Sequence, residues 1–196
     1  MRRRISHALE KGLARSHSRW SLHWEKKAGL AFPQLDGERT GIDWNSLTDV
    51  WVNLSTPDCS LDKLRPDGIH IQYDQSDQIL QSVIFEFTRT NDRVADFTGD
   101  KKAQKCLRYE PLRIAIEQIT GAPCSISIFV MGICSSFVVK EWNKALSPYG
   151  LSGIHVTSIF QAASHGAVEA LADQWRIRNV ALALAQRIEF SGNKHK

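Results

Sequence analysis

The stretch Arg65-Pro66-Asp67-Gly68-Ile69-His70-Ile71-Gln72-Tyr73 decides the predicted fold. Its first residues form a turn signal, and isoleucine then alternates with histidine and glutamine, as in a half-buried strand. A more buried strand is predicted at Gln81–Thr88, which contains Val83-Ile84-Phe85. We expect these two strands to pair as an antiparallel hairpin.

Elements on either side of this hairpin extend the pattern to a layered α/β domain. A helix is expected at 5–13, a first strand at 50–54, a helix at 99–119 and a buried strand at 125–133. Further elements are expected at 139–146 (helix), 153–159 (strand) and 166–188 (helix). The order predicts one α/β domain over residues 1–196, with an αβββαβ core and additional C-terminal helices.

Three local predictions accompany this order. The segment 20–24 alternates like a strand, but the charged residues after it favour a helix end. Pro111 is expected to kink or divide the helix near Tyr109, because proline lacks an amide donor. His70 is expected to contact solvent or DNA on the strand face opposite Ile69.

Charge is distributed unevenly along the 196 residues, of which 25 are basic and 21 acidic. Residues 1–27 hold eight basic against two acidic residues, residues 36–100 thirteen acidic against five basic, and residues 101–113 five basic against one acidic. Two basic segments therefore flank an acidic one. This pattern suits a protein that attracts phosphate and gathers carboxylates around a cation, and it equally suits a mixed, solvated surface.

Composition also bears on three other properties: secretion, membrane spans and the state of the cysteines. No apolar segment follows the basic N-terminus, so we expect an intracellular protein, with the nucleus as one candidate compartment. The uncharged stretch 118–139 is broken by glycine and proline, so no membrane span is expected. The four cysteines lack metal-ligand spacing and are expected to be free thiols.

Asp67 and Glu86 are the candidate metal ligands, because an antiparallel hairpin places them at neighbouring strand ends. Paired carboxylates suit Mg²⁺ or Mn²⁺, and the carbonyl of Phe87 is a further candidate ligand. Glu86 follows an apolar strand, where an acidic residue is disfavoured unless it has a partner. Glu10, on the first predicted helix, is a weaker candidate for the same site.

The helix after these strands carries the candidate catalytic lysine. Lys101, Lys105 and Arg108 share one helical face, and Lys102 points about 100° away. We favour Lys105 as the catalytic lysine, because Tyr109 one turn later can pack on its stem, and Lys102 is the alternative. Predicted contacts to nucleic acid are Lys101, Arg108, Arg65 and Arg89.

These motifs resemble those of the PD-(D/E)xK restriction-endonuclease-like superfamily. The set Arg65-Pro66-Asp67, Glu86, Lys102-x-x-Lys105 and Tyr109-x-x-Leu112 is similar to the restriction-like endonuclease domain of site-specific non-LTR retrotransposons, over a core of about 48–135. The resemblance implies a magnesium-dependent endonuclease that hydrolyses DNA phosphodiester bonds, from a mobile element. The usual acid-x-lysine reads Glu86-Phe87-Thr88, so Lys105 or Lys102 of the following helix would supply the lysine.

Two other classes of function remain open at the level of sequence. Thr88 in place of the strand lysine fits a nucleic-acid-binding module whose catalytic site has decayed, and a protein-interaction domain is a third reading. DNA is the expected partner, and a homodimer is compatible with the sequence.

Overall fold

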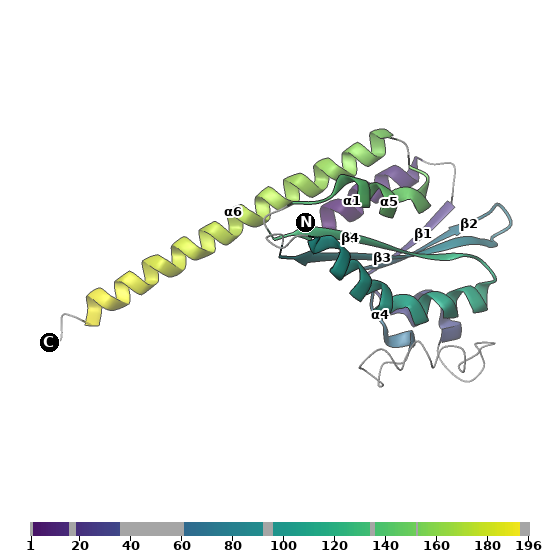
Figure 1. The fold of residues 1–196 in the computed structure, drawn as a ribbon, viewed down its shortest axis with the longest axis horizontal. Coiled ribbons are helices and arrows are strands. Elements are labelled where there is room, and N and C mark those ends of the chain that lie inside the picture. The colour runs from purple at the N-terminus through teal and green to yellow at the C-terminus, as the bar shows by residue number, and fades with distance from the viewer. Residues whose placement is uncertain are drawn as a thin grey trace.

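The computed structural model describes residues 2–15, 19–35, 61–91, 96–133, 136–151 and 153–192 (Figure 1). Its elements are α1 (Arg2–Ala14), β1 (Arg19–Trp24), α2 (Ala28–Ala31), η1 (Pro33–Leu35), η2 (Leu61–Lys63), β2 (Gly68–Tyr73), β3 (Ile79–Thr90), α4 (Phe97–Thr120), β4 (Cys124–Gly132), α5 (Val139–Leu146), η3 (Ser147–Tyr149) and α6 (Gly153–Gly192).

A four-stranded mixed sheet organises the molecule in the order β1-β2-β3-β4. The first three strands pair antiparallel, and β4 pairs parallel with β3. The turn between β2 and β3 is fixed by the Asp74 carboxylate, which accepts the amide protons of Ser76 at 2.7 Å and Gln78 at 2.8 Å. Helix α4 makes the long crossover that a parallel pair of strands requires.

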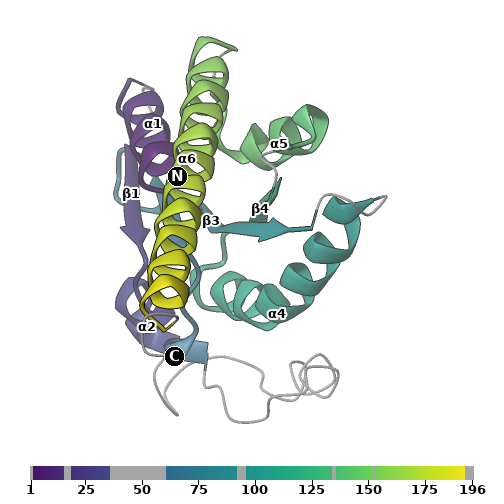
Figure 2. The ribbon, with the colours of Figure 1, turned by 90° about the vertical axis from the view of Figure 1, so that its left-hand side faces the viewer.

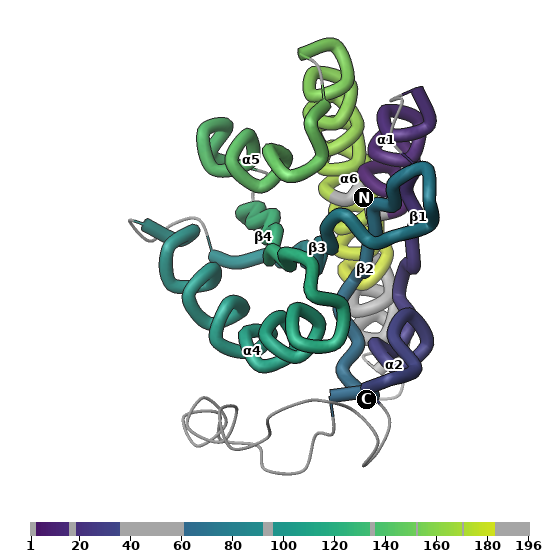
Figure 3. The backbone as a smooth tube through the Cα atoms, turned by 90° about the vertical axis from the view of Figure 1, so that its right-hand side faces the viewer, coloured from purple at the N-terminus to yellow at the C-terminus, as the bar shows by residue number. Residues whose placement is uncertain are grey.

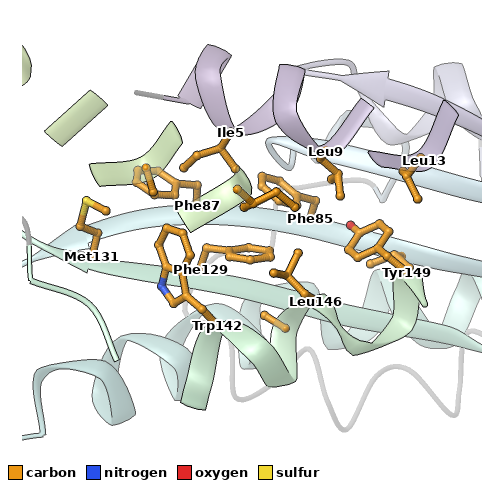
Figure 4. Close-up of a cluster of buried hydrophobic side chains, with 14 of the residues drawn as sticks. Ile5, Leu9, Leu13, Phe85, Phe87, Phe129, Met131, Trp142, Leu146 and Tyr149 are labelled. Atoms are coloured by element: carbon orange, nitrogen blue, oxygen red, sulfur yellow. The ribbon is translucent and has the colours of Figure 1, made fainter. Parts of the chain in front are cut away.

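Helices cover both faces of this sheet, as Figures 2 and 3 show. Alternate residues of β3 enter two separate cores. Val83, Phe85 and Phe87 join the core beneath α1, α5 and α6 (Figure 4), whereas Ile84 joins the core beneath α2 and α4. Glu86 shares the parity of Ile84, so β3 directs its carboxylate toward α4.

Most of the predicted elements are present, with shifted ends. The expected strands at 68–73, 81–88 and 125–133 correspond to β2, β3 and β4, and the expected helix at 99–119 corresponds to α4. The expected strand at 50–54 lies outside the described residues. Among the described residues, the third antiparallel strand of the sheet is β1, which corresponds to the ambiguous segment 20–24.

The strand predicted at 153–159 is wrong, because these residues form the first turns of α6. Their β-branched side chains favour a strand locally. The apolar residues Ile159, Ala163 and Ala167 recur every fourth position, however, and are buried in the core against α1. This contact with α1 outweighs the local preference of the segment for a strand.

The 40-residue helix α6 extends beyond the sheet (Figure 1). Side chains from 171 to 182 are exposed, and Trp175 keeps 67% of its surface accessible. Within the described ranges, none of the helices has the length and apolar composition that a membrane span requires.

Of the two outcomes predicted for Pro111 near Tyr109, a kink or a division, the structure has the kink: helix α4 runs through Pro111 without interruption. The helix changes direction near its middle (Figures 1 and 3), which is the bend that an internal proline produces. It ends at Gly121, whose left-handed conformation (φ 65°) caps the last turn. Apart from Thr98, the buried residues of α4 all lie between Tyr109 and Ile116, so mainly its second half packs in the core.

Candidate active site

Asp67 and Glu86 meet at the end of the β2–β3 ladder. Gly68 pairs with Phe85 in antiparallel register, so Asp67 and Glu86, one step further along each strand, lie opposite one another. The Asp67 carboxylate accepts the amide proton of Phe87 at 2.8 Å. In return, the Glu86 carboxylate accepts the amide proton of Asp67 at 3.4 Å. Each acid is thus held by the backbone of the strand opposite.

Glu86 is only 5% exposed, so its carboxylate needs polar partners in place of water. Lys105 of α4 forms an ion pair with Glu86 Oε1, and the Tyr109 hydroxyl donates to Oε2 at 3.1 Å. Burial, together with the negative charge of Glu86, raises the pKa of Tyr109 well above its usual range. Tyr109 therefore keeps its proton and serves as a hydrogen-bond donor to the buried carboxylate.

The other cations of α4 point to different partners. Lys102 pairs with Glu141 of α5, and its hydrogen bond lowers the pKa of that carboxyl. Lys101 donates to Gln104 at 2.9 Å, while the Arg108 guanidinium is exposed and lies 5.6 Å from the centroid of the Tyr109 ring. Of the two lysines proposed for catalysis, Lys105 therefore contacts Glu86, whereas Lys102 contacts Glu141 of α5.

The remaining predicted residues lie at the edges of this cluster. Arg65 is exposed and donates to the Glu25 carbonyl at 2.6 Å, and Arg89 donates to the Ile133 carbonyl at 2.8 Å. Phe87 contributes its amide proton to Asp67, and its side chain lies in the core. The roles of the Phe87 carbonyl as a metal ligand and of the two arginines as phosphate contacts stay predictions.

An open pocket of about 320 Å³ borders Asp67 on the side of α1. Glu10 lines this pocket, where its carboxylate accepts the Trp24 indole proton at 2.6 Å. Helix α1 thus places an acid in the pocket that Asp67 lines. Among the described residues, no three His, Cys, Asp or Glu side chains converge as a ready metal cage.

His70 does not contact solvent, contrary to the prediction. It is fully buried, its Nδ1 lies 2.7 Å from the Tyr149 hydroxyl, and its ring packs against Trp24 and Phe85. Burial, with a smaller contribution from His23, lowers the pKa of His70 from 6.5 to about 3. Alternation along β2 correctly placed His70 opposite Ile69, but both faces of the sheet are covered by helices.

Gly68 allows this close packing beside the candidate site. A Cβ atom at position 68 would lie 2.6 Å from His70 Nε2 and 3.0 Å from the Trp24 ring. We therefore expect Gly68→Ala to lower the free energy of unfolding by about 1–3 kcal/mol, as overpacking in a core does. Urea unfolding measures the change.

Gly153→Ala is the matched control for this prediction, because a Cβ there meets no described atom within 4 Å. It should leave stability unchanged or raise it slightly, since alanine favours a helix. Equal midpoints for Gly68→Ala and the wild type would contradict the close packing at Gly68.

Comparison with known proteins adds no family assignment. No family model matches the sequence, and no curated protein is significantly similar to it. The functional inference therefore depends on the geometry of the site. Sequence reasoning missed two of its contacts, the hydroxyl of Tyr109 on Glu86 and the pairing of Lys102 with Glu141. Nothing in the sequence around Glu141 indicates that pairing, because only the tertiary packing of α5 brings Glu141 close to α4.

Proposed function

We propose that this protein is a metal-dependent endonuclease that hydrolyses DNA phosphodiester bonds. The observation that carries the proposal is the buried carboxylate of Glu86, which is joined to Asp67 across the β2–β3 ladder and to Lys105 of α4. Two carboxylates and an ammonium at one sheet edge are the groups that metal-assisted phosphodiester hydrolysis uses.

The arrangement of the sheet supports a restriction-endonuclease-like core as part of this proposal. Helix α1 is followed by three antiparallel strands, helix α4 and a fourth strand parallel to β3. Apart from the short elements α2, η1 and η2 between β1 and β2, this order is compatible with the αβββαβ core that the sequence resemblance implied. Asp67 directly precedes β2, Glu86 lies on β3, and Lys105 lies on the following helix.

The donor set fits a magnesium or manganese ion held by Asp67 and Glu86. Mg²⁺ takes one or two carboxylates and completes its shell with water and phosphate oxygens, so a larger acidic cage is not required. A bound ion would lower the pKa of a coordinated water and stabilise negative charge on the phosphate.

The protein's own residues then have separate tasks. Tyr109 and the Asp67 amide hold Glu86 in place through hydrogen bonds to Oε2. Lys105 supplies a positive charge beside the carboxylates, where it can orient the attacking water or neutralise the phosphate. The ion pair with Glu141 holds Lys102 away from this position.

Conversion of supercoiled plasmid to nicked or linear DNA tests the proposal. We expect the wild-type protein to cleave in Mg²⁺ and to stop in EDTA. Asp67→Asn keeps an oxygen ligand but loses its charge, so its rate should fall about tenfold or more. Asp173→Asn, on the exposed part of α6, is the matched control and should cleave like the wild type.

Two outcomes would count against an endonuclease. Equal cleavage by the wild type and Asp67→Asn would assign the activity to a contaminant or another site. DNA binding in EDTA without cleavage in Mg²⁺ or Mn²⁺ would instead favour the decayed nucleic-acid-binding module.

A further inference from the structure

A cationic groove of about 370 Å³ lies between α1 and the first turns of α6. These two helices run side by side in Figures 1 and 2, and they pack against each other. At the floor of the groove, a Cβ on Gly12 would lie 3.2 Å from Leu151 and 3.4 Å from the Cβ of His155. The groove is therefore a fixed feature of the packed helices.

Basic side chains at helical spacing line the α1 side of this groove. Arg4, Lys11 and Arg15 lie seven and four residues apart and are all exposed, and His155 faces them from α6. Arg4 is neutralised by Glu169, with its Nε 3.0 Å from the carboxylate. Lys11 and Arg15 form no ion pair with any carboxylate in the described part of the chain. The groove thus presents two uncompensated positive charges.

The groove adjoins the pocket that Asp67 lines. His7 lines both the groove and the pocket that contains Asp67. In Figure 4, Ile5, Leu9 and Leu13 succeed one another along α1 in the same direction as Phe87, Phe85 and Tyr149 in the layer beneath. Residues of α1 from Arg3 to Glu10 border the pocket that Asp67 lines, and Lys11 and Arg15 lie beyond them along the chain.

We propose that this groove binds the phosphodiester backbone of DNA flanking the cleaved bond, with Lys11 and Arg15 contacting phosphates. The inference rests on the proposed nuclease function, because that function brings DNA to Asp67. Arginine and lysine supply most contacts to phosphate oxygens, and such contacts position the duplex. At about 1.5 Å per residue, the distance along the helix axis from Arg4 to Arg15, directly after the end of α1, is about 16 Å, which matches the rise of about five base pairs.

The salt dependence of DNA affinity tests this groove without relying on cleavage. The double variant Lys11→Ala/Arg15→Ala is titrated with a duplex of about 30 base pairs in EDTA at several salt concentrations. We expect binding about tenfold weaker near 100 mM salt, and a slope of log K against log salt reduced by about two, since each lost phosphate contact removes about 0.9. Both side chains are exposed, so the fold and melting temperature should be unchanged.

Arg176→Ala/Arg178→Ala is the matched control, because it removes two exposed arginines from α6 beyond the groove. It should keep the wild-type slope. A wild-type slope for the Lys11 and Arg15 variant would overturn the proposal that the groove binds DNA, even if cleavage depends on Asp67. If the slope is reduced but Asp67→Asn cleaves like the wild type, DNA binding by the groove is supported and the proposed endonuclease site at Asp67 is not.

A competition experiment separates a DNA backbone from a small phosphate ligand. Inorganic phosphate is added at constant ionic strength, and duplex binding should not change. Displacement of DNA from the wild type, but not from the Lys11 and Arg15 variant, would assign the groove to a free phosphate and overturn the proposal.

Discussion

Replacing Lys105 with methionine is expected to lower the rate of magnesium-dependent DNA cleavage by about 10²–10³-fold, the usual loss when one electrostatic donor is removed from an active site. Replacing Lys102 with methionine should change the rate less than about threefold, because its ammonium pairs with Glu141 in a partly exposed ion pair. The two lysines are one turn apart on α4, so each variant is the control of the other. Initial rates on plasmid DNA measure both effects.

The loss of Lys105 also leaves the buried Glu86 carboxylate with fewer partners, which lowers stability. Thermal unfolding and DNA affinity in EDTA therefore accompany the rate measurement. If Lys105→Met unfolds, Lys105→Arg keeps the positive charge beside Glu86 but moves its hydrogen-bond donors. A folded Lys105→Arg that cleaves slowly and binds DNA normally would still support a catalytic lysine.

The assignment of Lys105 would be wrong if Lys105→Met cleaved at the wild-type rate and Lys102→Met were inactive. That result would require Lys102 to leave Glu141 and turn toward Asp67. The separate ion pairs of the two lysines make this prediction sharper than the helical spacing alone. By that spacing, Lys101 and Arg108 share the face of Lys105, but neither contacts Glu86 in the structure.

The hairpin that carries both acids could be predicted because its signals are local. Alternation in 68–73 and the turn before it are properties of neighbouring residues, and β2 keeps these bounds. Antiparallel pairing then follows from the short connection to β3, and it brings Asp67 to Glu86. The apolar strand sequence before Glu86 predicted that this acid needs a partner, but it did not select among the lysines of α4.

Other features depend on contacts between distant residues. The segment 19–24 is ambiguous by itself, and it becomes β1 because β2 offers an open edge for pairing. Residues 153–159 have strand-forming side chains, yet packing against α1 makes them helical. The pairing of Lys102 with Glu141 requires α5 to pack near α4. Neither propensity nor spacing contains that information.

At His70, helices on one face of the sheet bury a polar side chain that strand alternation alone predicts to be exposed. In a half-buried strand, a histidine opposite isoleucine faces water, and such a ring would titrate near pH 6.5. Here α1, α5 and α6 cover that face, and Tyr149 supplies a hydrogen-bond partner. The same alternation therefore gives a buried, neutral ring.

The buried ring of His70 is expected to make the protein less stable in mild acid. Its pKa falls from 6.5 to about 3 on folding, because burial disfavours the charged imidazolium and His23 opposes it further. Above pH 6.5 the ring is neutral in both states. Below pH 6.5 the unfolded chain binds a proton that the folded protein excludes, so the free energy of unfolding falls by about 1.4 kcal/mol per pH unit until about pH 3.

Urea unfolding between pH 7 and pH 4.5 measures this contribution as a difference between variants. His70→Gln keeps an acceptor for the Tyr149 hydroxyl but cannot take up a proton, so its stability should fall about 3 kcal/mol less than that of the wild type over this range. His165→Gln, on the exposed surface of α6, is the matched control and should follow the wild-type profile.

Parallel profiles for the wild type and His70→Gln would contradict this prediction. They would mean that the folded protein admits the proton, although a ring enclosed by Trp24, Phe85 and Tyr149 should exclude it. The pH profile, rather than absolute stability, decides the outcome, because any packing defect of glutamine acts equally at every pH.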